Sequence, residues 1–137
     1  MSLFVDTSVW YAAADGNDPD NRRAKEILAS GDILVLTDHV LSETWTLIRN
    51  RIHRRAAERF WDAIRNGAAN MEPVGLADLE AAWAIGLAWK DQDFSLVDRT
   101  SFAVMRRLGI ECAASLDEHF AVFRFGPRNR RAFTVLR

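Results

Sequence analysis

Four acidic residues lie where predicted strands end or predicted helices begin, and side chains at such points can meet at one edge of a sheet. Asp6 directly follows an N-terminal apolar run, and Asp117 comes three residues after another apolar run. Glu43 falls in the first turns of a predicted helix, and Asp98 lies at the start of another. Clustered carboxylates repel one another unless cations lie between them, and oxygen ligands suit Mg²⁺ or Mn²⁺. The pattern favours a divalent metal site formed by Asp6, Glu43, Asp98 and Asp117.

An acidic residue at the start of a helix also has a purely structural use. Asp6, Asp98 and Asp117 lie at predicted helix starts, where a carboxylate accepts hydrogen bonds from free backbone N–H groups and meets a favourable dipole. A glutamate such as Glu43 is equally ordinary in a first helical turn. Each aspartate taken alone is better explained as a helix cap, so only the joint pattern favours metal binding.

Alternating strands and helices must position these residues. Continuous apolar runs, typical of parallel strands covered on both faces, occur at 3–5, 33–36 and 110–114, with a weaker strand at 71–74 and an edge strand at 133–136. Helices are predicted over 9–14, 18–30, 37–52, 54–67, 78–87, 95–108 and 117–123. This alternation predicts a three-layer α/β/α sandwich around a mostly parallel sheet, in which ligands bind beyond the carboxyl ends of the strands.

Local signals set several helix boundaries. Asp18 before Pro19, Thr37 and Asp78 are the expected N-caps of three helices. Within the helix that starts at Asp78, the side chains expected to face inward are Leu79, Ala82, Trp83, Gly86 and Leu87. The five tryptophans are interpreted mainly as core residues, although Trp45 with Phe60 and Trp61 is an alternative exposed patch for another protein chain.

The composition is that of one ordinary globular domain spanning residues 1–137. Hydrophobic residues make up 49% and charged residues 27% of the chain. No apolar run approaches the roughly 18 residues of a membrane span, and Asp6 interrupts the first ten residues, so we expect no membrane contact and a cytoplasmic location. The single cysteine, Cys112, fits a buried thiol in a reducing compartment.

The net charge of −1 hides two arginine-rich stretches. Such clusters are most often solvated helix faces, and the alternative is contact with a nucleic-acid backbone. One stretch contains Arg49, Arg51, His53, Arg54, Arg55 and Arg59, and the other contains Arg124, Arg128, Arg130, Arg131 and Arg137.

Four segments in series resemble the PIN domain, and most closely the VapC toxins of toxin–antitoxin pairs. They are Asp6-Thr7-Ser8 after the first strand, Ser42-Glu43 in a helix, the run from Asp93 to Phe102, and Leu116-Asp117-Glu118-His119-Phe120. Each segment alone is weak, but together they cover nearly the whole chain in order and spacing.

The resemblance implies a five-stranded sheet and an acidic pocket that cleaves RNA phosphodiester bonds with Mg²⁺ or Mn²⁺. Asp6, Glu43 and Asp98 match the first three acidic positions, and Asp117 matches the fourth. Ser8 and Thr100 or Ser101 match hydroxyl positions beside the metal. Glu118 departs from the pattern, because a basic or neutral residue is more usual there, which leaves open whether Asp117 or Glu118 reaches the metal. The nearby Asp91 and Asp93 are interpreted as loop or cap residues.

Divalent ions would supply the chemistry of such a site. They neutralise the phosphodiester, lower the pKa of a bound water and, as a pair about 3.5–4 Å apart, stabilise the attacking and leaving oxygens. No nucleophilic side chain is needed, and His39, His53 and His119 have neither the pattern of a triad nor that of a zinc motif. His119 is expected to be a surface residue.

The resemblance also implies an RNA substrate held by the arginine stretches, a small antitoxin protein as partner, and a homodimer. Three alternatives remain: a housekeeping PIN nuclease without a toxin role, a PIN-like scaffold that binds RNA or protein without cleavage, and a receiver-type signalling module. The receiver reading requires a phosphorylatable aspartate at the end of a central strand, where this chain has Leu36-Thr37. Metal-dependent cleavage of RNA separates these alternatives.

Overall fold

Five parallel strands build the central sheet of the computed structural model, which describes residues 1–137. They lie in the order β3-β2-β1-β4-β7, so that β1 is central. The side chains of Leu3, Phe4 and Val5 on β1 are almost completely buried, as expected of a strand covered on both faces. The predicted mostly parallel five-stranded sheet is confirmed, with bounds β1 (Ser2–Val5), β2 (Ile33–Thr37), β3 (Asn70–Glu72), β4 (Cys112–Ala114) and β7 (Thr134–Leu136).

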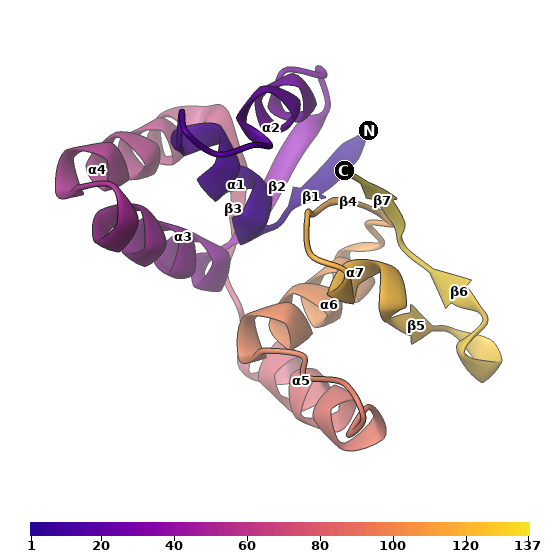
Figure 1. The fold of residues 1–137 in the computed structure, drawn as a ribbon. Coiled ribbons are helices and arrows are strands. Elements are labelled where there is room, and N and C mark those ends of the chain that lie inside the picture. The colour runs from indigo at the N-terminus through magenta and orange to yellow at the C-terminus, as the bar shows by residue number, and fades with distance from the viewer.

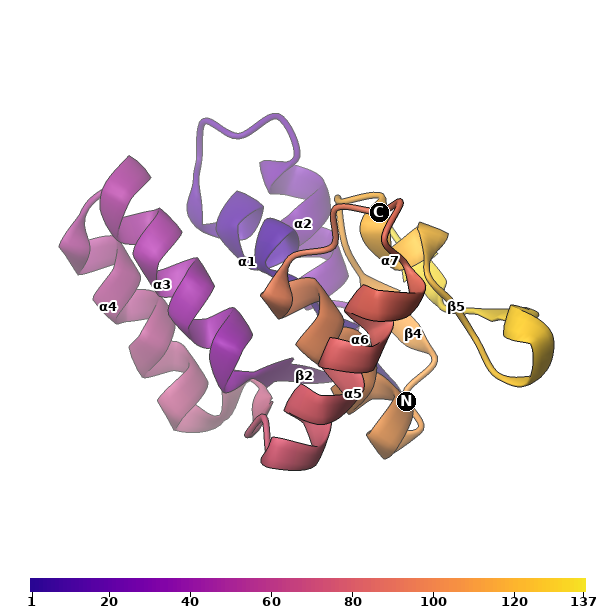
Figure 2. The ribbon, with the colours of Figure 1, turned by 90° about the horizontal axis from the view of Figure 1, so that it is seen from below.

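The helices form two packed groups beside the sheet (Figure 1). One group contains α1 (Thr7–Ala14), α2 (Asn21–Leu28), α3 (Asp38–Arg51) and α4 (Arg54–Ala63), which continues into a π-helical turn (Ile64–Ala68). The other contains α5 (Leu76–Ala88), α6 (Leu96–Leu108) and α7 (His119–Val122). In the turned view α3 lies along α4, and α5 lies along α6 (Figure 2).

A short antiparallel hairpin follows α7. It consists of β5 (Arg124–Phe125) and β6 (Arg131–Ala132), joined through a 3₁₀ turn (Pro127–Asn129). The hairpin projects on the side of the molecule away from α3 and α4 (Figures 1 and 2). None of the helices is long and apolar enough to cross a membrane.

Stacked aromatic rings fix α6 and α7 against the sheet. The ring of Phe102 on α6 stacks on that of Phe123 with centroids 4.5 Å apart, and it meets Phe120 edge to face at 4.9 Å. Phe120 in turn lies 6.2 Å from Phe4 of the central strand. Such pairs stabilise by about 0.5–1.5 kcal/mol each beyond their buried area. This cluster therefore sets where the segments that carry Asp98 and Asp117 lie.

Two predicted helix starts were misplaced. The second helix begins at Asn21 and not near Asp18, whose carboxylate instead accepts a hydrogen bond from the backbone N–H of Asp20 at 2.8 Å. The helix α5 begins at Leu76, so that Asp78 occupies its third position and accepts from the backbone N–H of Gly75. Thr37, by contrast, caps α3 as predicted, through a hydrogen bond from the N–H of Val40.

The predicted inward face of α5 is only partly right. Ala82 is buried as predicted and Gly86 is half-buried, but Trp83 is 66% exposed and Leu79 and Leu87 are also exposed. Because α5 is apolar on several faces, its sequence pattern does not distinguish the face that packs on α6 from the face in solvent. The interpretation of the tryptophans as core residues therefore fails for Trp83, and it also fails for Trp61, which is 43% exposed beside Trp45 and Leu41 in a hollow of about 270 Å³.

An ion-pair cluster ties α6 to α5 and β3. Arg107 donates from Nε and Nη2 to the two carboxylate oxygens of Asp78 at 2.8 and 3.0 Å, and from Nη1 to Glu72 at 2.9 Å. The hydrogen bonds from Arg107 hold the pKa of the buried Asp78 carboxyl below its ordinary value. Loss of Arg107 would leave that carboxylate buried without a counter-ion.

We therefore expect Arg107→Gln to lower the free energy of unfolding by about 2 kcal/mol at pH 7. The pKa of Asp78 is lowered in the folded state, so this contribution is present above the ordinary aspartate pKa and disappears as the pH falls through the lower folded value. Urea unfolding at pH 7 and at pH 3 measures both effects. The control Arg65→Gln removes an exposed pair with Asp62 and should change stability by less than about 0.5 kcal/mol; equal losses in the two variants would contradict the assignment.

Candidate functional site

A cleft of about 500 Å³ lies beyond the carboxyl ends of β1 and β4. Asp6 follows β1 and Asp117 follows β4, while Glu43 comes from the second turn of α3 and Asp98 from the first turn of α6. All four carboxylates named from the sequence line this one cleft. The parallel order of the strands explains why residues far apart in sequence meet there, because the carboxyl ends of parallel strands share one edge.

Asp6 is the most deeply placed of the four acids and is only 5% exposed. Its Oδ2 accepts hydrogen bonds from the hydroxyls of Ser8 at 2.8 Å and Ser115 at 3.0 Å. Its side chain makes no capping bond to α1, although Asp6 stands at the N-cap position. Burial raises the pKa of Asp6 to about 6, against the lowering effect of the two hydroxyls and with a further increase from the charge of Asp98. The capping explanation therefore does not account for this carboxylate.

Asp98 both caps its helix and faces the cleft. Its Oδ2 accepts from the backbone N–H of Ser95 at 3.0 Å, and the Ser95 hydroxyl accepts from the backbone N–H of Asp98, which completes a capping box. The same Oδ2 lies 2.7 Å from Nδ1 of His119. Asp98 can therefore cap its helix and also bind a partner in the cleft, because one carboxylate has enough lone pairs for both.

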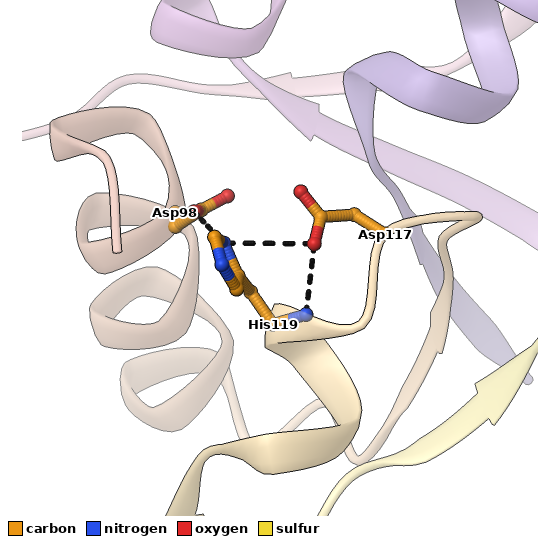
Figure 3. Close-up of side chains that lie close together, drawn as sticks. All are labelled: Asp98, Asp117 and His119. Carbon is orange, nitrogen blue, oxygen red and sulfur yellow. Dashed lines mark hydrogen bonds and ion pairs between the residues drawn. The ribbon is translucent and has the colours of Figure 1, made fainter. Parts of the chain in front are cut away.

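His119 completes a compact group with Asp98 and Asp117 that sequence reasoning missed. The carboxylates of the two aspartates face each other, and the imidazole approaches both (Figure 3). One ligand atom from each residue lies within 4.8 Å of the others. Asp117 holds the turn in place, since its Oδ1 accepts from the backbone N–H of His119 at 2.9 Å. The expectation that His119 is an ordinary surface residue is wrong.

The charges around His119 favour its protonated form. Burial alone lowers the pKa of His119, but the hydrogen bond to Asp98 and the negative charges of Asp117, Asp98 and Asp93 outweigh burial and raise it above its ordinary value. A cation therefore suits the space between these carboxylates, whether it is an imidazolium or a metal ion.

Some of the other residues that the sequence singled out line the cleft, and others do not. Ser8 lies at the cleft, as does Asp93, which was interpreted as a loop or cap residue. Thr100 and Ser101 do not line it: both are buried on α6, where the Thr100 hydroxyl donates to the carbonyl of Leu96. Glu118 is exposed and outside the cleft, so Asp117 is the acid of that pair that lines it.

Ser115 is a second residue that sequence reasoning missed. Its hydroxyl reaches Asp6 and also accepts from the backbone N–H of Asp117 at 3.1 Å. Its position directly after β4 is the same signal that singled out Asp6 directly after β1. Serine at a strand end is too common, however, for that signal to stand without the partner carboxylate.

The two arginine stretches occupy different parts of the surface. The first lies at the end of α3 and the start of α4. The second lies in the β5–β6 hairpin on the other side of the molecule, except for Arg137, which follows β7 at the C-terminus (Figure 1). Only Arg51 of the first stretch lines the acidic cleft, and no residue of the second does.

Known proteins share this sequence pattern and this fold. The family model described as "PIN domain" matches residues 3–126. The 23S rRNA-specific endonuclease VapC20 of Mycobacterium tuberculosis is 40% identical over 125 residues, which cover 90% of this chain and 95% of the relative. Ribonuclease VapC26 of the same organism is 27% identical over 136 residues, covering 98% of this chain and 99% of the relative.

Solved structures show the same fold. The crystal structure of M. tuberculosis VapC20, described as a sarcin–ricin loop cleaving toxin, superposes with a TM-score of 0.80 at 38% identity and covers 85% of this chain and 90% of that one. A toxin–antitoxin complex from Klebsiella pneumoniae contains a chain with a TM-score of 0.69 at 16% identity, over 88% of this chain and 91% of that one. The protein described here belongs to the PIN-domain family and is similar to its VapC members.

Proposed function

We propose that this protein is a metal-dependent endoribonuclease and the toxin of a toxin–antitoxin pair. The observation that carries the proposal is the convergence of Asp6, Glu43, Asp98 and Asp117 on one cleft. The relatives support the reaction and the substrate class, because VapC20 is described as a 23S rRNA endonuclease and VapC26 as a ribonuclease. The sarcin–ricin loop named for VapC20 is the first RNA to test.

The donor set of the cleft fits a hard divalent cation. Asp98 and Asp117 with His119 form the compact group, while Asp6 and Glu43 line the cleft outside it. We propose that the four carboxylates hold Mg²⁺ or Mn²⁺, whose preferred ligands are oxygens. A bound ion of this kind neutralises the phosphodiester and lowers the pKa of a bound water.

The chain's own residues prepare the carboxylates for this task. The hydroxyls of Ser8 and Ser115 orient Asp6, and the capping box orients Asp98. Ser8 also accepts from the backbone N–H of Leu116 at 2.9 Å, which ties the segment after β1 to the segment after β4. Ligands fixed in this way need little reorganisation when a cation binds.

The first test is cleavage of RNA. We expect the purified protein to cut a sarcin–ricin loop hairpin in Mn²⁺ or Mg²⁺ and to stop in EDTA, since the carboxylates alone supply no nucleophile. Asp6→Asn should reduce the rate by at least about 100-fold, because a ligand of the reacting centre is lost. Asp62→Asn, an exposed site on α4, is the matched control. Undiminished activity of Asp6→Asn, with contaminating nucleases excluded, would falsify the site assignment.

The second test uses the pH dependence of stability and needs no substrate. The pKa of Asp6 is raised to about 6 in the folded state, so ionisation of Asp6 destabilises the fold as the pH rises from about 4 to above 6. In EDTA, the stability of Asp6→Asn relative to the wild type should therefore increase by about 2 kcal/mol between pH 4 and pH 8. The titration of His119 is common to both proteins and largely cancels in this difference.

Metal binding should offset part of the destabilisation that ionised Asp6 causes in the wild type. Mn²⁺ at ten times its dissociation constant would raise stability by about 1.4 kcal/mol, or roughly 3–5 °C in Tm for a domain of this size. The response of Asp6→Asn should be much smaller. Urea and thermal unfolding measure both effects; parallel pH profiles and equal responses to Mn²⁺ would show that Asp6 is not a desolvated ligand.

The third test concerns the toxin role and the partner. We expect expression of the wild type, but not of Asp6→Asn, to slow bacterial growth, and co-expression of a small partner encoded beside it to restore growth. A partner segment that presents an arginine or lysine would match the charge of the cleft. If the wild type is harmless at levels where it is soluble and metal-loaded, the housekeeping-nuclease reading replaces the toxin reading.

A further inference from the structure

The acidic cleft presents an electrostatic problem for an RNA substrate. Seven carboxylates line the cleft, and each would repel a phosphodiester backbone wherever no cation intervenes. A metal site relieves this repulsion only near the ion. These residues are Asp6, Asp18, Asp20, Glu43, Asp93, Asp98 and Asp117.

Arg51 is the only arginine or lysine that lines the cleft. It is the last residue of α3, and with Glu43 and Leu47 it forms a row at four-residue spacing on the face of the helix that borders the cleft. An α-helix rises by about 1.5 Å per residue, so the backbone of Arg51 is about 12 Å along the axis from that of Glu43. Arg51 therefore lies along the cleft, two turns beyond Glu43.

The guanidinium of Arg51 has an aromatic support and no carboxylate partner. Its central carbon lies 5.2 Å from the centroid of the Tyr11 ring. None of the ion pairs within 4.0 Å in the structure includes Arg51. Tyr11 is buried and its hydroxyl donates to Asp15 at 2.8 Å, so the ring is a fixed platform. A guanidinium over an aromatic ring keeps its N–H groups available for a planar anion.

We propose that Arg51 binds a phosphate of the RNA that neighbours the scissile phosphate, and so sets how the strand enters the acidic cleft. The inference rests on the proposed function and adds a substrate-binding residue outside the carboxylate group. The distance along α3 from Glu43 makes Arg51 a contact for a flanking phosphate. Its loss should therefore weaken RNA binding and leave the chemical step largely unchanged.

Neighbouring arginines provide controls for the charge itself. Arg49 lies on the same exposed end of α3 but does not line the cleft, and its guanidinium donates to Asn50 at 3.3 Å. A general attraction of RNA to the basic stretch would respond equally to Arg49→Gln and Arg51→Gln. A specific phosphate contact would respond only to the second. Arg51→Lys keeps the charge and loses the planar fork.

The experiment measures RNA binding separately from cleavage. Fluorescence anisotropy with a labelled sarcin–ricin loop hairpin and with oligo(U) is recorded over a series of KCl concentrations, in Ca²⁺ buffer in which both RNAs are verified to stay intact. Arg51→Gln should weaken binding about tenfold, and the slope of log affinity against log salt should become shallower by about 0.7–0.9. Arg51→Lys should retain the slope and lose part of the affinity, while Arg49→Gln should match the wild type.

Single-turnover cleavage of the hairpin in Mn²⁺ supplies the second readout. For Arg51→Gln, the protein concentration at half-maximal rate should rise about tenfold, with the maximal rate within about twofold of the wild type. Because Arg51 is exposed, the Tm of the Arg51→Gln protein should equal that of the wild type. A fall in maximal rate at unchanged half-saturation would place Arg51 at the reacting centre and overturn the inference.

The outcomes distinguish this inference from the proposed function. Wild-type cleavage in Mn²⁺, together with equal affinity and salt slope in wild type and Arg51→Gln, would overturn the inference and leave the nuclease function standing. RNA binding whose salt slope depends on Arg51, without cleavage of any RNA, would support a phosphate contact at Arg51 and contradict the nuclease function. Absence of binding to both RNAs would overturn the inference.

Discussion

The crowding of carboxylates at one edge of a parallel sheet is the constraint on which the rest of this structure depends. A parallel sheet delivers the ends of its strands to the same edge, and this chain places an acid after β1 and another after β4. The fold must then hold these groups close against their mutual repulsion. It does so with hydroxyl donors from Ser8 and Ser115, a capping box at Asp98, and the imidazole of His119.

The aromatic cluster supplies much of the stabilisation that makes this possible. Phe102 is fully buried four residues after Asp98, and Phe120 is fully buried three residues after Asp117. The contact between the Phe102 and Phe120 rings joins the two segments that carry Asp98 and Asp117. The acidic segments are therefore bound to the core by their own neighbours, and the repulsion at the cleft is balanced by hydrophobic and aromatic contacts one helical turn away.

Sequence reasoning was most successful where a local signal coincides with a position in the fold. The apolar runs predicted where the strands lie. Thr37 was correctly predicted as a cap because the helix that its hydroxyl caps follows it directly in the chain. It failed where the answer depends on which surfaces meet. The sequence of α5 predicts that Ala82 is buried but does not reveal that Trp83, Leu79 and Leu87 are exposed. Nothing near His119 in the sequence indicates that Asp98 of another helix lies 2.7 Å away. Thr100 and Ser101 were named by resemblance, yet both are buried on α6 and do not line the cleft. Ser101 is three residues after Asp98, on the same side of the helix, so its sequence position alone does not exclude it from the cleft.

The double use of Asp98 has a consequence for how such a protein loses activity over generations. A side chain that both starts a helix and faces the reacting groups has few substitutes: glutamate keeps the charge but alters the reach, and most other residues lose the cap as well. Asparagine is the exception, since its side-chain oxygen can still accept the hydrogen bond from the backbone N–H of Ser95 while it carries no charge. On the proposed function, a silent yet well-folded descendant is one amino-acid change away, and it would still present the same outer surface to any partner that recognises the active protein.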